Sequence, residues 1–106
     1  MKFEAEYIYR NTDGTPHEKV KRIAGKQGFP VFHWKNGKWE PGKAEKALPY
    51  LIGLWFREIR ALFDVEGEKD ADILIKLGFL ATCNRGGAGN FQPEIVQYYK
   101  GRTVYI

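Results

Sequence analysis

Short apolar runs of strand length alternate with helical segments over residues 61–106, and this alternation restricts the possible folds more than any other feature of the chain. The apolar spacing predicts these elements in order: strand 61–65, helix 68–77, strand 79–83, helix 94–100 and strand 103–106. Strands joined in this way by helices form parallel sheets with right-handed crossovers. The second half of the chain is therefore expected to be an α/β unit of the βαβαβ type.

The first third of the chain has the pattern of antiparallel hairpins. Residues 3–9 largely alternate apolar and polar side chains, the turn signal Asp13-Gly14 follows, and residues 19–23 predict the returning strand. A second hairpin is centred on Asn36-Gly37, because this dipeptide accepts the positive φ angles of a type I′ turn. The N-terminal part is therefore expected to be a segment of β-hairpins.

A break in the pattern separates these two parts. Glu40-Pro41-Gly42-Lys43 is typical of a linker, and Pro49 can open a short helix that runs to about Glu58. These signals predict a basic, hairpin-rich segment at residues 1–47 and an α/β unit at residues 48–106. The whole chain is therefore expected to have a mixed α+β fold.

Composition excludes several classes of protein. The 106 residues include 43% hydrophobic and 28% charged side chains, which is typical of a globular chain. No apolar stretch is long enough to cross a bilayer, and no signal-peptide pattern begins the sequence. The single cysteine, Cys83, excludes a disulfide framework, and the lack of serine excludes a Ser-His-Asp triad. A cytoplasmic location is expected, with no membrane partner.

The formal net charge of +4 is unevenly distributed. Residues 1–60 contain 12 basic and 7 acidic side chains, whereas residues 61–106 contain 5 basic and 6 acidic ones. A basic first part favours a polyanion as partner, and the local acidic cluster in the second part favours a metal or catalytic site. The alternative is that both are solvated faces, as most runs of charge are.

Two polar segments follow the first two predicted parallel strands. Glu66-Gly67 follows one strand, and Asn84–Gly89 follows the next. Because ligands of open parallel sheets bind beyond the carboxyl ends of the strands, both segments are expected at one functional edge. A carboxylate at Glu66 can hold Mg²⁺ or take a proton from a hydroxyl, while Gly67 leaves room for a ligand or a sharp turn. A surface role for Glu66 is an equal alternative.

The neighbouring acids have a simpler explanation. Acidic residues in the first turn of a helix stabilise it through the helix dipole, and this accounts for Glu68, Asp70 and Asp72. Cys83 is expected to be packed and not nucleophilic, because His17 and His33 belong to the other half of the chain.

The glycine-rich loop could bind an anion. Gly86 and Gly87 can bring backbone N–H groups close to a phosphate, and the adjacent Arg85 favours this interpretation. The loop lacks the spacing of a P-loop or a dinucleotide site, so a tight connection is the alternative.

The second hairpin combines aromatic and basic residues. Trp34 and Trp39 lie close to Lys35 and Lys38 in the sequence, and this combination can stack bases and neutralise phosphates of single-stranded nucleic acid. The alternative for the tryptophans, which the pattern favours, is a cross-strand pair that stabilises the hairpin. Binding of nucleic acid by Lys35 and Lys38 remains a hypothesis.

Several motifs together resemble a known protein family. They are Val65-Glu66-Gly67-Glu68-Lys69-Asp70-Ala71-Asp72, Leu77-Gly78, Ala81-Thr82-Cys83-Asn84 and Gly86-Gly87-Ala88-Gly89. The chain resembles the TOPRIM-domain region of phage- and plasmid-type DNA primases and primase-helicases. The upstream residues Tyr7-Ile8-Tyr9, Asp13-Gly14, Lys19-Val20 and Arg22 look like the β-rich segment that precedes TOPRIM, and Leu48-Pro49 falls at a short helix. The resemblance extends over nearly the whole chain.

The resemblance implies a partial TOPRIM-like, Rossmann-like sheet that contributes to Mg²⁺-dependent nucleotidyl transfer. Glu66 matches the strand-end glutamate that acts on Mg²⁺ with a later Asp-x-Asp motif, Gly67 matches the glycine after it, and Asp70 matches the following acid. Asp64 and Arg85 depart from the pattern, since an apolar residue and a proline are common there. Residues 1–106 contain no zinc motif, and the Asp-x-Asp of the family is expected to begin just after residue 106.

The chain is therefore expected to be a fragment or a shortened homologue of a primase, inactive alone, that binds DNA or RNA and, in the complete enzyme, nucleotides. Two alternatives are open: a non-catalytic nucleic-acid-binding module, and a small phage interaction protein that kept the fold. The last strand, residues 103–106, could mediate self-association through its free edge.

Overall fold

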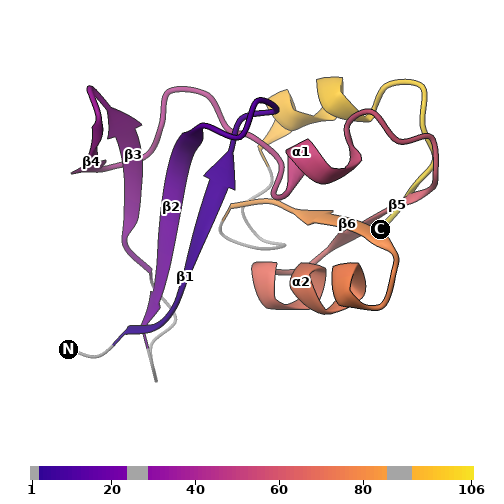
Figure 1. Cartoon of the computed structure of the whole chain (residues 1–106), viewed down its shortest axis with the longest axis horizontal. Coiled ribbons are helices and arrows are strands. Elements are labelled where there is room, and N and C mark those ends of the chain that lie inside the picture. Colours follow the sequence, from indigo (N-terminus) through magenta and orange to yellow (C-terminus); the bar gives the residue numbers. More distant parts are fainter. Residues whose placement is uncertain (1–2, 24–28, 86–91) are drawn as a thin grey trace.

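The structure is a computed structural model that describes residues 3–23, 29–85 and 92–106. It has a mixed α+β fold with one antiparallel and one parallel sheet (Figure 1). The strands are β1 (Phe3–Arg10), β2 (Pro16–Ile23), β3 (Val31–Lys35), β4 (Lys38–Pro41), β5 (Leu62–Val65), β6 (Leu80–Cys83) and β7 (Val104–Tyr105). The helices are α1 (Ile52–Trp55), α2 (Glu68–Lys76) and the 3₁₀ helix η2 (Pro93–Tyr99). No helix in the described ranges is long and apolar enough to span a membrane.

The antiparallel sheet has the strand order β1-β2-β3-β4, which confirms both predicted hairpins. The turn between β3 and β4 has φ angles of 51° at Asn36 and 79° at Gly37, as a type I′ turn requires. This turn aligns Trp34 with Trp39 and Lys35 with Lys38 across the two strands. The hairpin register is therefore set by the Asn-Gly dipeptide.

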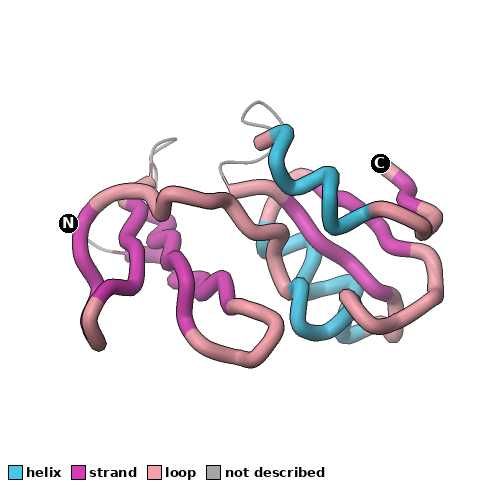
Figure 2. Tube along the Cα trace, turned by 90° about the horizontal axis from the view of Figure 1, so that it is seen from above, coloured by secondary structure: helices cyan, strands magenta, loops and turns pink. Residues whose placement is uncertain are grey.

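The second sheet is parallel, as the alternation of strands and helices predicts, and has the order β6-β5-β7. Helix α2 covers one face of this sheet, and α1 and η2 cover the other (Figure 1). The helices of the described residues gather in this half of the molecule, as Figure 2 shows from above. The C-terminal strand β7 is short and pairs with β5, so self-association through it stays a prediction.

Three predicted elements differ in the structure. The linker expected at 40–43 begins later, because β4 continues to Pro41 at the sheet edge, where a missing N–H is tolerated. The helix expected from Pro49 to Glu58 is shorter in the structure, where α1 extends from Ile52 to Trp55. The helix expected at 94–100 is the 3₁₀ helix η2.

A side chain distant in the sequence accounts for the early end of α1. The guanidinium of Arg102 donates hydrogen bonds to the backbone carbonyls of Trp55, Glu58 and Arg60 at 2.8, 2.5 and 3.2 Å. These carbonyls therefore have an alternative to the helical N–H groups. Arg102 also lies 5.0 Å from the centre of the Trp55 ring, so it holds the segment after α1 against the parallel sheet.

A single buried cluster joins the two sheets. It contains Tyr9 and Val20 from the hairpins together with Tyr50, Ala71, Ala81 and Cys83 from the α/β part. Tyr50 also connects the segment before α1 to β6, because its N–H donates to the carbonyl of Cys83 at 3.1 Å and its carbonyl accepts from Thr82 at 2.8 Å. The segments 1–47 and 48–106 thus share this cluster, while a second cluster of Ile52, Trp55, Leu62 and Leu80 lies within 48–106.

Candidate functional site

The register of the parallel sheet brings two predicted site segments to the same edge. Val65 lies opposite Cys83, so Glu66 and Asn84 leave adjacent strands at the same level. Glu66 is exposed directly beyond the end of β5, which is the central strand, and Asn84 is buried. The structure therefore places Glu66 at the position where ligands of open parallel sheets bind.

Gly67 is the N-cap residue of α2, and its conformation does not require glycine. Its φ of −152° and ψ of 172° are extended backbone that any residue adopts, and no side chain caps the helix here. A Cβ atom built at Gly67 would meet no described atom within 4 Å. A sharp turn is thus not the reason for this glycine, and access for a ligand remains the functional interpretation.

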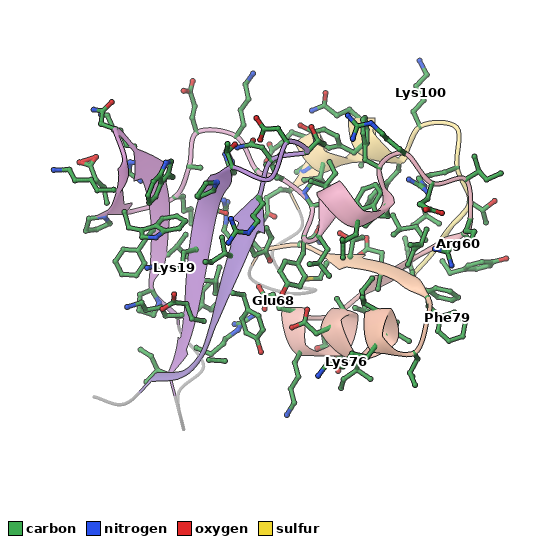
Figure 3. All side chains as sticks on the ribbon, viewed as in Figure 1. Lys19, Arg60, Glu68, Lys76, Phe79 and Lys100 are labelled. Carbon is green, nitrogen blue, oxygen red and sulfur yellow. The ribbon has the colours of Figure 1, made fainter. Side chains whose placement is uncertain are left out.

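The first turn of α2 contains one exposed and one buried acid. Asp70 is exposed, as the helix-dipole interpretation expects. Glu68 is only 1% exposed and differs from that expectation. Its carboxylate accepts a hydrogen bond of 2.7 Å from the Tyr9 hydroxyl and one of 2.5 Å from the Arg22 guanidinium. Figure 3 shows Glu68 between the hairpins and α2.

Sequence reasoning missed this role of Glu68, because its partners come from strands far away in the chain. No local pattern distinguishes Glu68 from Asp70. Asp72 also has a partner, since the Tyr50 hydroxyl donates to it at 2.8 Å. Of the three acids explained by the helix dipole, two therefore tie α2 to other parts of the core.

The donor set near the sheet edge does not form a complete metal site. Within residues 3–23, 29–85 and 92–106, no group of three or more His, Cys, Asp or Glu side chains could hold a metal ion. Glu66 offers one carboxylate, whereas Mg²⁺ in phosphoryl transfer commonly takes more than one protein oxygen. The described residues alone thus do not fit the Mg²⁺ that the family resemblance implies.

Arg85 lies at the predicted edge but is bound within the protein. Its guanidinium donates to the Glu18 carboxylate at 2.6 Å, and the two side chains are 9% and 1% exposed. Glu18 also accepts a hydrogen bond from the backbone N–H of Ala44 at 2.8 Å. A phosphate at Arg85 would therefore compete with a buried carboxylate. Gly86 and Gly87, the predicted backbone contacts of that phosphate, lie outside the described residues.

Asp64, the other departure from the family pattern, also has a partner in the chain. It lies in the middle of β5, half-buried, and the Tyr99 hydroxyl donates to it at 3.1 Å. Burial raises the pKa of the Asp64 carboxyl above its ordinary value, and the hydrogen bond from Tyr99 opposes this increase. Asp64 and Arg85 are thus both accommodated by a specific polar partner.

Cys83 is fully buried in the core, as the sequence indicated. Burial and the negative charge of Glu68 raise the pKa of its thiol, so the thiolate is disfavoured. Its sulfur lies 3.7 Å from the Tyr9 hydroxyl. The position and the raised pKa both agree with a structural role.

The basic hairpin presents its lysines to solvent. Lys35 and Lys38 are exposed cross-strand neighbours beside the turn, where their like charges meet. Trp34 and Trp39 form the cross-strand pair that the pattern favours, with ring centroids 5.0 Å apart and planes at 72°. Lys19 lies 4.7 Å from the Trp39 ring centre, while Trp34 remains 38% exposed. Stability thus accounts for the pair, and Trp34 still presents an aromatic surface.

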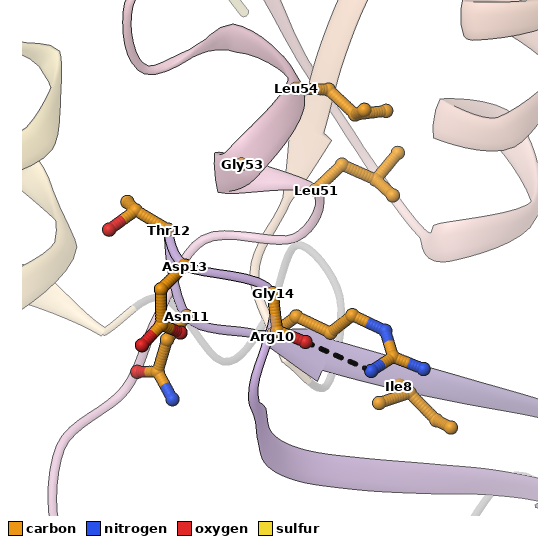
Figure 4. A pocket seen from close by; sticks show the side chains of 9 residues that line it. All are labelled: Ile8, Arg10, Asn11, Thr12, Asp13, Gly14, Leu51, Gly53 and Leu54. Atoms are coloured by element: carbon orange, nitrogen blue, oxygen red, sulfur yellow. Dashed lines mark hydrogen bonds between the residues drawn. The ribbon is translucent and has the colours of Figure 1, made fainter.

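A pocket of about 410 Å³ lies between the β1–β2 turn and α1 (Figure 4). Its lining includes Ile8, Leu51 and Leu54, with Arg10 at one side. Arg10 donates to the Gly14 carbonyl at 3.1 Å, and Leu51 has a left-handed φ of 61°. Left-handed backbone at a leucine is a strained state that stores free energy near the pocket. No motif in the sequence pointed to this pocket.

Comparisons of the chain with models of protein families, with curated proteins and with solved structures found no match.

Proposed function

We propose that this chain is part of a nucleotidyl-transfer module of the DNA primase type, with a TOPRIM-like sheet and a basic hairpin segment that binds single-stranded nucleic acid. The observation that supports this proposal best is the exposed Glu66 carboxylate beyond the end of β5, the central parallel strand. That position is where such sheets bind ligands. The motifs around Glu66 that resemble phage-type primases supply the reaction class.

Glu66, Gly67 and Asp70 have separate roles in this proposal. Glu66 would bind a metal ion or take the proton of an attacking hydroxyl. Gly67 would allow the ligand to approach the first turn of α2, where Asp70 is exposed. Mg²⁺ and nucleotides would bind in the complete enzyme. Because the described residues supply too few ligands, we propose that this chain by itself is inactive.

A paramagnetic ion tests the position of the site. Mn²⁺ added to the ¹⁵N-labelled chain is expected to broaden the amide signals of Glu66 and Gly67 first, even if binding is weak. Glu66→Gln should abolish this effect. Glu94→Gln removes another exposed acid, on η2, and serves as the matched control that should leave the broadening unchanged. Equal broadening in the wild type and in Glu66→Gln would contradict the proposal.

A second candidate function is nucleic-acid binding without catalysis. It is favoured by Lys35 and Lys38, which form no ion pair with any carboxylate among the residues that the structure describes. Replacing both with alanine is expected to weaken the binding of single-stranded DNA, and affinity should fall steeply with salt because counterions are released. Unchanged affinity would remove the hairpin from the binding surface.

A further inference from the structure

An open groove of about 560 Å³ lies between the second hairpin and the chain that follows it. It is lined by His17 of β2, by His33, Trp34 and Lys35 of β3, and by the segment 43–46. No candidate site of the parallel sheet includes these residues, and the groove is separate from Glu66.

Hydrogen bonds hold the wall of this groove in place. Nε2 of His17 lies 2.5 Å from the carbonyl oxygen of Lys46, and Nδ1 of His33 lies 3.1 Å from that of Gly42. A carbonyl only accepts, so each ring nitrogen must be the donor. Between these two bonds, the N–H of Ala44 donates to the buried Glu18 at 2.8 Å. The segment 42–46 is thus fixed to β2 and β3 at three points.

The lining is rich in lysines that have no carboxylate partner. Lys35, Lys43 and Lys46 are exposed, and none of them forms an ion pair within the described ranges 3–23, 29–85 and 92–106. Glu45 is the acidic side chain of the lining. Lys19 and Lys21 of β2 differ, since they lie 3.8 and 3.9 Å from Glu6. The groove therefore has an excess of positive charge available to an anion.

Trp34 adds an aromatic surface to these cations. It lines the groove, is 38% exposed, and is braced by the edge-on contact with Trp39. A braced ring loses little conformational freedom when a base stacks on it. Inorganic phosphate has no ring to use this surface, and the bases of a duplex are already stacked on one another. A chain of phosphates with unpaired bases can use both the lysines and the tryptophan.

We infer that this groove binds single-stranded nucleic acid, with backbone phosphates at Lys35, Lys43 and Lys46 and a base stacked on Trp34. The inference rests on the proposed function for the class of ligand. It adds a defined site, and it extends the binding surface from the hairpin tip to the segment 43–46.

Fluorescence anisotropy with labelled oligothymidylate and oligouridylate of about 15 nucleotides tests the groove. Lys43→Ala with Lys46→Ala is expected to weaken binding about tenfold at low salt and to reduce the salt slope by about 0.7 for each lysine. The matched control, Lys76→Ala with Lys100→Ala, removes the same charge from the α/β half of the molecule (Figure 3) and should change affinity less than about twofold.

The aromatic contact has its own pair of variants. Trp34→Ala should weaken binding about fivefold or more. Trp39→Ala also breaks the ring pair but leaves the Trp34 surface, so it should have a smaller effect. Circular dichroism of each variant checks that the hairpin is folded.

The outcomes distinguish a failure of the groove from a failure of the proposed function. If the wild type binds both oligonucleotides and the Lys43, Lys46 and Trp34 variants bind equally well, the groove is wrong and nucleic-acid binding stands. If the wild type binds neither oligonucleotide, the groove and the proposed nucleic-acid binding of the hairpin segment are both overturned, and only the metal site tested with Mn²⁺ at Glu66 is unaffected. If polyphosphate competes as well as the oligonucleotides and Trp34→Ala has no effect, the site binds any polyanion and the base contact is overturned.

Discussion

Arg85, at the end of β6, donates a hydrogen bond of 2.6 Å to Glu18 on β2, and both side chains are buried. This ion pair joins the strand edge of the parallel sheet to the antiparallel sheet. It also supports the segment 42–46, since Glu18 accepts the N–H of Ala44. Arg85 therefore has a structural role that is independent of any phosphate.

Breaking this ion pair should destabilise the fold strongly. Arg85→Met leaves the Glu18 carboxylate buried without its cation, and such a loss commonly costs about 3–5 kcal/mol. Urea denaturation measures the free energy of unfolding. The double variant Arg85→Met with Glu18→Gln should be clearly less destabilised than the sum of the single variants, because the buried charge is gone. Additive losses would mean that the pair is not coupled.

The hydrogen bond between Tyr9 and Glu68 should also contribute to stability. Tyr9→Phe removes the hydroxyl that donates to the buried carboxylate at 2.7 Å, and the expected loss is about 1–3 kcal/mol. Tyr105→Phe is a matched control, because Tyr105 is 55% exposed. This variant should lower the free energy of unfolding by less than about 0.5 kcal/mol. Thermal unfolding compares the two variants, and equal losses would refute a special role for Tyr9.

Gly67 should tolerate alanine where another glycine does not. At Gly67 the backbone is extended and a Cβ has open space, and the poorer N-cap preference of alanine opposes the gain from a less flexible unfolded chain, so Gly67→Ala should change stability by less than about 0.5 kcal/mol. Gly37→Ala forces alanine to a φ of 79° in the hairpin turn and should cost about 1–2 kcal/mol.

The same variant tests whether a ligand approaches Gly67. If Gly67→Ala retains full stability but loses the Mn²⁺ broadening at Glu66, the glycine serves ligand access. If both properties are unchanged, Gly67 has no role in the site.

Asp64 should give a pH dependence of defined sign. Burial raises its pKa above 3.8, so the folded state holds the proton more tightly than the unfolded state. Its contribution to stability is therefore highest at low pH and falls as pH rises from about 3.8 through the raised pKa. Asp64→Asn keeps an oxygen that can accept from Tyr99 and removes the titration.

The measurement for Asp64 is a difference between two proteins. Urea denaturation of the wild type and Asp64→Asn at several pH values isolates this carboxyl from the other acids. The stability of Asp64→Asn relative to the wild type is expected to increase as pH rises through that range. A difference that stays constant with pH would show that Asp64 titrates normally.

The elements that sequence reasoning predicted well are those with local causes. The Asn36-Gly37 turn, the helix α2 and the parallel strands β5 and β6 follow from turn chemistry and apolar spacing within a few residues. The position of Glu66 beyond β5 follows in the same way. The short α1 was not predictable from local signals, because the carbonyls at and after its end bond to Arg102, which lies more than forty residues later.

The candidate sites likewise include residues that local patterns identify and residues whose roles depend on distant contacts. Glu66 and Lys35 could be chosen from strand ends and turn signals, and the structure leaves both exposed. The buried pairs of Glu68 and of Arg85 required the docking of one sheet against the other. The groove at 43–46 was also missed. Nothing in the sequence indicated that the rings of His17 and His33 bind the backbone carbonyls of Lys46 and Gly42.

The shared core also determines how the chain must fold. Arg85 and Glu18 are 67 positions apart, and Tyr9 and Glu68 are 59 apart, so each contact closes a long loop. The entropy of loop closure is lost before such contacts form, and chains with many distant pairings fold slowly. Neither the hairpins nor the parallel sheet can complete its polar core without the other. Refolding should therefore be a single cooperative event, in which the strand edge that bears Glu66 is assembled only when the hairpins dock.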